Sequence, residues 1–222
     1  MTTPITHFKT QRDLAEACER LGARDEAMAR LVTLCGVPPL RQREAGFSGL
    51  AAIVTGQQVS TAAARAIWDR VIATLGRVDP QAIEAASDET LGIACGLSRA
   101  KVRTLRAMAG AVQDGTLDFA RLETLENDAV HATLTALPGI GPWTADVYLL
   151  FCLRRADAWP AGDLAVVEAV RMLRGLDERP RGAEAIACAD GWRPYRGAAA
   201  HLLWAYYALE KGRAGAPVAQ TS

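Results

Sequence analysis

The string LPGIGPW (137–143) has the spacing of two helices joined by a very tight turn, and such a turn can bind an anion. Pro142 suits the first position of a new helix, because its φ is already helical and its missing N–H would have no intrahelical partner there. Gly139 and Gly141 permit positive φ and let another backbone approach closely. The amides that open the new helix then point outward at the positive end of its dipole. A DNA phosphate is a suitable occupant.

Leu137 and Ile140 are expected to face inward and to join the two helices of this hairpin. Binding through backbone amides would be independent of base sequence, since only backbone meets backbone. The alternative is an ordinary corner between two helices, for which a lone Gly-x-Gly gives weak support. The residues expected to form the phosphate-binding hairpin are Leu137, Gly139, Ile140, Gly141 and Thr144.

Asp163 is the acidic side chain with the clearest potential for chemistry. It directly precedes the apolar string LAVVEAV (164–170), so the local sequence by itself favours a helix N-cap. One carboxylate oxygen can cap a helix while the other faces a cleft, and the two roles can therefore coexist.

The elements that must position these residues are helices. Apolar residues recur at helical spacing, whereas alternation typical of strands is rare, and aromatic residues make up only 6% of the chain. We therefore expect an all-α protein of about ten short helices that pack by ridges and grooves. The predicted helices cover residues 10–21, 24–35, 47–57, 60–76, 87–95, 98–109, 127–136, 142–153, 164–174, 182–189 and 194–210.

Composition limits the class of protein. The 222 residues are 50% hydrophobic, which is enough for a sizeable core, and 25 basic residues balance 25 acidic ones. Neutral charge gives no support for nucleic-acid binding, so that inference depends on local motifs. No apolar run reaches the ~20 residues that cross a bilayer, and the first residues do not resemble a signal peptide. Five scattered cysteines suit reduced thiols, and we expect a cytoplasmic protein, nucleoid-associated if bacterial.

Several strings together resemble one family. LPGIGPWTADVYLL (137–150) resembles the helix-hairpin-helix of the base-excision DNA glycosylases, and WPAGDLAVVEAV (159–170) resembles their Gly/Pro-rich loop that ends in an aspartate, here Asp163. Three further strings match in order, at 53–71, 96–109 and 192–204. The last of them resembles the closing helix of the alkyladenine branch, the DNA-3-methyladenine glycosylase II type.

The resemblance implies a base-excision repair enzyme that flips alkylated purines, of the 3-methyladenine and 7-methylguanine type, out of duplex DNA and hydrolyses their N-glycosidic bond. Asp163 would be catalytic, because breaking this bond develops positive, oxocarbenium-like charge on the sugar. A carboxylate about 4 Å away contributes roughly 4 kcal/mol of attraction. That energy corresponds to a rate effect on the order of a thousandfold.

Departures from the family pattern narrow the expected chemistry. Family members that cut the DNA strand carry a lysine nucleophile where this chain has Trp143, so the resemblance implies a monofunctional enzyme. Only Cys188 follows Cys152, which excludes the four-cysteine iron–sulfur cluster of many relatives. We expect no cofactor and no metal bound by side chains, although hairpin carbonyls could hold a structural monovalent or divalent cation.

The resemblance also assigns a base pocket and a wedge. Trp143 and Trp204 match aromatic pocket positions, where an indole face attracts a cationic base. Val147 stands where relatives place a tyrosine, and its neighbour Tyr148 is assigned to the pocket instead. Gln58 matches the residue that fills the gap left by the flipped base, or else it is a polar residue at a helix C-terminus. Other candidates for the missing pocket tyrosine are Tyr206, Tyr207 and Trp159.

The expected organisation is two interlocked helical lobes with a cleft between them. Residues 1–45 and 155–210 would form one lobe, residues 46–154 the helix-hairpin-helix lobe, and residues 211–222 a flexible tail. The expected partner is double-stranded DNA with alkylated bases, bound by a monomer away from membranes. Two alternatives stay open, a non-catalytic helix-hairpin-helix DNA-binding module and a glycosylase with another base preference.

Overall fold

The computed structural model describes residues 5–212, and every regular element in this range is helical, which confirms the all-α prediction. The chain divides after Gln42 and again after Tyr148 into two compact units. Unit 1 contains the residues up to Gln42 and those from Leu149 onward, and unit 2 is Arg43–Tyr148. Across the described residues, no helix is both long and apolar enough to traverse a bilayer. Most of the expected tail, residues 213–222, lies outside the described residues.

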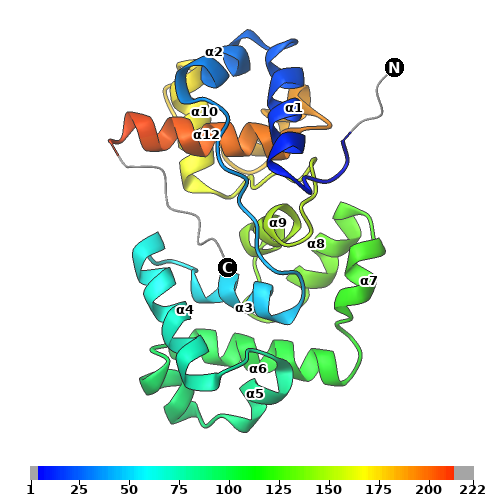
Figure 1. Cartoon of the computed structure of the whole chain (residues 1–222), viewed down its shortest axis with the longest axis vertical. Helices are drawn as coiled ribbons and strands as arrows, with labels where there is room; N and C mark the ends of the chain where they lie inside the picture. Colours follow the sequence, from blue (N-terminus) through cyan, green and yellow to red (C-terminus); the bar gives the residue numbers. More distant parts are fainter. Residues whose placement is uncertain (1–4, 213–222) are drawn as a thin grey trace. The chain divides into compact units, whose positions relative to one another are not determined.

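Unit 1 is organised around its last helix, α12 (Arg196–Glu210), which contacts α1 (Gln11–Gly22), α2 (Glu26–Cys35) and α10 (Leu164–Arg174) (Figure 1). Two shorter elements, α11 (Ala183–Ala187) and the 3₁₀ turn Asp190–Trp192, lie between α10 and α12 in sequence. The core of unit 1 comprises side chains such as Leu14, Leu21, Met28, Leu31, Val166, Val170, Leu202 and Leu203.

Unit 2 packs its helices around α6 (Arg99–Gln113), which contacts α3, α5 and the π-helical turn η1. The elements of this unit are α3 (Phe47–Thr55), α4 (Thr61–Leu75), α5 (Pro80–Ala85), η1 (Thr90–Ala94), α6, α7 (Phe119–Thr124) and α8 (Asn127–Thr135). The division between the units falls inside α9 (Pro142–Phe151). The buried side chains of unit 2 include Leu50, Ile53, Val71, Ile83, Leu91, Leu105, Met108 and Leu134.

The helix prediction missed α5 and α7, which have six residues each. Fewer than two helical turns cannot show a repeating apolar stripe, so periodicity gives no signal for them. Their caps were the available signal, because Asp79 and Asp118 each accept a backbone N–H of the helix that follows. The predicted helix at 87–95 is in part the π-helical turn η1.

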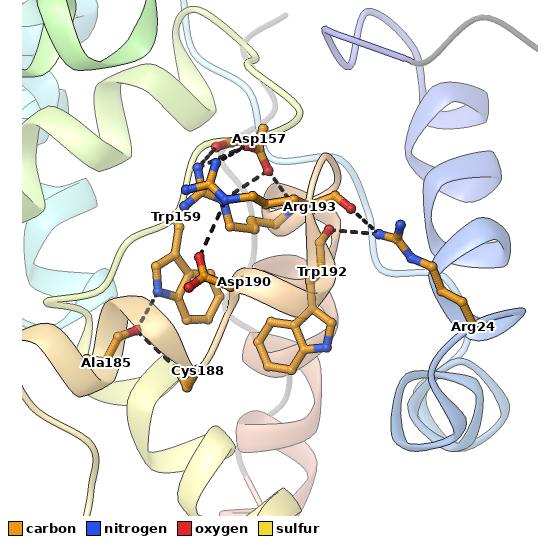
Figure 2. Close-up of polar contacts among 9 residues, drawn as sticks. Arg24, Asp157, Trp159, Ala185, Cys188, Asp190, Trp192 and Arg193 are labelled. Atoms are coloured by element: carbon orange, nitrogen blue, oxygen red, sulfur yellow. Dashed lines mark hydrogen bonds and ion pairs between the residues drawn. The ribbon is translucent and has the colours of Figure 1, made fainter.

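A polar clamp in unit 1 fixes the loop that leads to Asp163. The Asp157 carboxylate accepts a hydrogen bond from Arg196 Nε at 2.9 Å. It also accepts one from Arg193 Nη1 at 2.8 Å (Figure 2). Arg196 Nη2 also donates to the Asp157 carbonyl oxygen at 2.8 Å. Further along the loop, Trp159 Nε1 donates to the carbonyl of Ala185 at 2.8 Å. The same Nη2 of Arg196 donates to Asp157 Oδ2 at 2.9 Å, so the Arg196 guanidinium binds both carboxylate oxygens. Bidentate bonding of this kind favours one orientation, so the loop begins from a defined position.

Close packing at the start of α12 gives the first prediction. A Cβ added at Gly197 would lie 2.7 Å from Leu150 Cδ1 and 2.9 Å from the Ala156 carbonyl oxygen. We expect Gly197→Ala to lower the free energy of unfolding by about 1–3 kcal/mol in urea denaturation, because the core is overpacked. The control is Gly110→Ala in α6, where a Cβ meets nothing within 4 Å. That change should stabilise the protein by about 0.5–1 kcal/mol. Equal stability of Gly197→Ala and the wild type would contradict the packing described here.

Candidate functional site

Asp163 is both the N-cap of α10 and the acceptor of an indole hydrogen bond. Its Oδ1 atom accepts the N–H groups of Ala165 at 3.0 Å and Val166 at 3.1 Å. The same oxygen accepts Trp204 Nε1 at 3.0 Å, and the aspartate is half-buried. Three donors on one oxygen fix the plane of the carboxylate, because it cannot turn without losing all of them. The capping role expected from the sequence is therefore present, and the carboxylate also contacts α12.

Trp204 is the aromatic partner of Asp163 and is only 7% exposed. The Phe151 ring lies 5.5 Å from its ring centroid at a 49° tilt, and the His201 ring meets it edge-on at 5.8 Å. Arg41 places its guanidinium carbon 4.8 Å from the centre of the indole, within the range of a cation–π interaction. Trp204 and Asp163, two residues singled out in the sequence, are thus brought into direct contact in unit 1.

Arg41 is a residue that the sequence analysis did not identify. It lies in the segment between α2 and α3, and its backbone N–H donates to His201 Nε2 at 3.3 Å. Burial lowers the pKa of the Arg41 guanidinium, and the negative charge of Asp163 works against that shift. The guanidinium therefore lies close enough to interact electrostatically with the carboxylate. No motif surrounds this residue in VPPLRQRE (37–44), and only the tertiary contact reveals it.

His201 is fixed as a neutral imidazole. Its Nδ1 lies 2.8 Å from the carbonyl oxygen of Gly197, which can only accept, so Nδ1 carries the proton. Its Nε2 accepts the backbone N–H of Arg41. Burial lowers the pKa of His201 to about 4, and the positive charge of Arg41 acts in the same direction. Protonation of Nε2 would remove the acceptor that holds the Arg41 backbone.

The hairpin in unit 2 has the expected form. α8 ends at Thr135 and α9 begins at Pro142, and Gly139 has a φ of +84°. A Cβ at Gly139 would lie 1.9 Å from Thr104 Oγ1, so only glycine lets the turn approach α6 this closely. Within residues 5–212 the N–H groups of Gly139 and Gly141 have no hydrogen-bond partner. Ile140 is buried as expected, whereas Leu137 is only half-buried.

Gln57 joins this hairpin to the turn between α3 and α4. Its Nε2 donates to the Gly139 carbonyl at 3.1 Å and to Thr144 Oγ1 at 2.9 Å. Thr144 is 2% exposed, so its hydroxyl acts inside the protein as an acceptor for Gln57. The role expected for Thr144 at the hairpin therefore includes support of the turn from within. Sequence reasoning singled out Gln58 and passed over Gln57.

Gln58 is exposed at the tip of the same turn, with a φ of +57°. A glutamine in the left-handed region is uncommon and is strained relative to glycine, and such strain concentrates at functional positions. The next residue, Val59, is 38% exposed. The turn therefore exposes the Gln58 side chain to solvent, while the Gln57 side chain bonds the turn to the hairpin.

The remaining pocket candidates differ in accessibility. Trp143 is half-buried in the first turn of α9. Tyr148 is fully buried, its hydroxyl accepts the N–H of Gly46 at 3.0 Å, and its ring lies 6.1 Å from that of Phe119. Tyr148 therefore lies in the core, and its assignment to a base pocket stays a prediction. Trp159 is buried, and its Nε1 is bonded to Ala185.

The side chains that could bind a metal ion do not form a cluster in the part of the chain that the structure describes. Across residues 5–212, no group of three or more His, Cys, Asp or Glu side chains could hold a metal ion. The five cysteines are free thiols, and burial raises the pKa of Cys18 to about 12. A thiol with so high a pKa stays protonated and is a poor ligand.

Comparisons with known proteins place this geometry in context. A family model described as "HhH-GPD superfamily base excision DNA repair protein" matches residues 51–194. DNA-3-methyladenine glycosylase 1 of Schizosaccharomyces pombe is 33% identical over 198 residues, 86% of each chain. The structure of the S. pombe 3-methyladenine DNA glycosylase Mag1 in complex with abasic DNA has a TM-score of 0.78 at 32% identity and covers 88% of this chain and 97% of its own. A DNA-3-methyladenine glycosidase from Bacillus halodurans has a TM-score of 0.75 at 28% identity over 93% of both chains.

The buried imidazole beside Arg41 predicts a pH dependence of stability. The unfolded chain binds a proton at His201 near pH 6.5, whereas the folded protein resists protonation until about pH 4. Stability from this group is therefore present above pH 6.5 and is lost as the pH falls toward 4, with a total of about 3 kcal/mol. Urea denaturation between pH 7 and pH 4 should show a shallower decline for His201→Gln than for the wild type. An unchanged slope in the variant would contradict the assignment.

Proposed function

The chain belongs to the HhH-GPD superfamily of base excision DNA repair proteins, and on that premise we propose that it excises alkylated purines from duplex DNA. The family match confirms the resemblance drawn from the sequence motifs. The proposed reaction is hydrolysis of the N-glycosidic bond of bases of the 3-methyladenine and 7-methylguanine type. The names of the S. pombe and B. halodurans relatives support this substrate class.

The observation that carries the proposal is the fixed carboxylate of Asp163. Loss of a purine leaves oxocarbenium-like charge on the sugar, and a negative oxygen nearby stabilises it. The bonds from α10 and Trp204 hold Asp163 in one orientation, so little reorganisation is needed as this charge develops. The same carboxylate could orient or deprotonate the attacking water. A base methylated at N3 or N7 is already cationic and leaves without a general acid, so one carboxylate suffices.

The proposed DNA contacts of unit 2 are the hairpin and the turn beside it. The N–H groups of Gly139 and Gly141, next to the positive end of α9, suit a phosphate oxygen. Gln58 would enter the duplex where the base has left, since its amide offers both donors and an acceptor to the orphaned partner base. Gln57 supports this assignment, because it joins the two contact points through hydrogen bonds.

The proposed base pocket uses tryptophan faces. Trp204 contacts the carboxylate directly, which would place a stacked base close to the bond that breaks. An indole face favours a cationic base over a neutral one by about 0.5–2 kcal/mol. Trp143 is a second candidate, and its half-buried side chain belongs to the first turn after the hairpin. Double-stranded DNA is the proposed partner, bound by a monomer in the cytoplasm without a cofactor.

The first test of this function is Asp163→Asn. Asparagine still caps a helix and still accepts the Trp204 N–H, so the fold should survive while the negative charge is lost. We expect release of 3-methyladenine and 7-methylguanine from methylated DNA to fall on the order of a thousandfold. The matched control is Asp118→Asn, because Asp118 caps α7 through one oxygen in the same way. This control should keep full activity.

The outcome separates the alternatives. If the wild type binds DNA but releases no base, the protein is a non-catalytic DNA-binding module. If it releases other bases in place of methylated purines, the family assignment holds and the substrate class is wrong. If Asp163→Asn is as active as the wild type, the carboxylate is only a helix cap.

The second test concerns strand cleavage. The chain has three lysines, Lys9, Lys101 and Lys211, and Trp143 occupies the position where strand-cutting relatives carry their nucleophile. Lys101 Nζ donates to the carbonyl oxygen of Thr55 at 2.7 Å. We expect the protein to leave an intact abasic strand and to form no covalent adduct when borohydride is added, because the position from which the lysine of strand-cutting relatives attacks the sugar holds Trp143, which has no amine. A borohydride-trapped complex would contradict the monofunctional assignment.

A further inference from the structure

The guanidinium of Arg41 covers the indole that the proposed function gives to the flipped base. Its carbon lies 4.8 Å from the centre of the Trp204 ring. A flat base stacked between the two groups needs about 3.5 Å on each side, so about 7 Å in total. The observed separation is too small for a base to enter between them. A base that stacks on this face must therefore displace Arg41.

Arg41 is the ring partner of Trp204 best able to move. Phe151 and His201 are carried by α9 and α12, and His201 is bonded to Gly197. Arg41 comes from a non-helical segment, and only its backbone N–H is bonded to His201. Within residues 5–212 its guanidinium has no hydrogen bond or ion pair, so the indole face and the field of Asp163 hold it in place.

We propose that Arg41 determines base specificity, because its guanidinium occupies the Trp204 face and a flipped base enters only by displacing it. This inference rests on the proposed function. A cationic base replaces one positive charge with another, and it regains the attraction to the indole and to Asp163 that Arg41 gives up. A neutral base regains only stacking. The free-energy cost of displacing Arg41 is therefore offset when the entering base is a methylated, cationic purine. It is not offset when the base is neutral.

The effect of Arg41 should appear in the fraction of enzyme–DNA complexes in which the flipped base occupies the pocket. If a base already occupies the pocket in almost all complexes, removal of Arg41 raises its occupancy little. If a base is mostly excluded, its occupancy rises by the full factor by which Arg41 disfavours insertion. Removal of the guanidinium should therefore raise the excision of neutral purines more than that of cationic ones. A purely structural role of Arg41 would change both rates by the same factor.

The experiment measures single-turnover excision at saturating enzyme. The two substrates are duplexes that contain 7-methylguanine, a cationic lesion, or hypoxanthine, a neutral purine. The variants are Arg41→Met and Arg41→Gln, which remove the charge, and the control is Arg41→Lys, which keeps it. We expect the ratio of the hypoxanthine rate to the 7-methylguanine rate to rise about 3- to 10-fold in both neutral variants. In the lysine variant it should stay within about 2-fold of the wild type.

The measured ratio either supports or overturns the proposed role of Arg41. An unchanged ratio, a ratio that moves toward 7-methylguanine, or a lysine variant that behaves like the methionine variant overturns the proposal. Hypoxanthine release below detection in the wild type and in both neutral variants also overturns it. If urea denaturation shows no folded state for Arg41→Met, the comparison is made with Arg41→Gln alone. A wild type that releases no 7-methylguanine refutes the proposed function itself, which is a different failure.

Discussion

The hydrogen bond from Trp204 Nε1 to Asp163 Oδ1 is the contact around which unit 1 is arranged. It joins the last helix, α12, to the residue before α10, and so adds a polar link between two helices that pack against each other. The clamp of Arg196 on Asp157 holds the other end of the intervening loop to the same helix. A loop fixed at both ends to α12 can place a carboxylate reproducibly, as the proposed reaction would require.

The same contact explains why the neighbouring charges are arranged as they are. The negative charge of Asp163 favours the charged form of the Arg41 guanidinium, and the same guanidinium lies over the indole of Trp204. His201 completes the arrangement as a neutral acceptor, since a second positive charge beside Arg41 would be repelled. Each side chain in this group thus limits the protonation state or the position of another.

Features contained in continuous sequence were predictable. The hairpin around Gly139 and the cap at Asp163 each depend on a few adjacent residues, and long helices such as α4 show their apolar repeat plainly. Arg41 was not predictable, because its partner Trp204 is distant in the chain and no local pattern records the contact. The burial of Tyr148 was not predictable for a related reason. Its place on α9 follows from the sequence, but its burial against Phe119 depends on how α7 packs.

The bonds of Gln57 give unit 2 a mechanical property. Because one amide holds both the Gly139 carbonyl and the Thr144 hydroxyl, the hairpin and the tip at Gln58 form a single stiff piece. If the hairpin binds a phosphate of a DNA duplex, Gln58 would therefore contact that duplex at a fixed number of nucleotides from the bound phosphate. The position of Gln58 along the DNA would then be set by the distance within the protein between the hairpin and Gln58, and it would not depend on the base sequence.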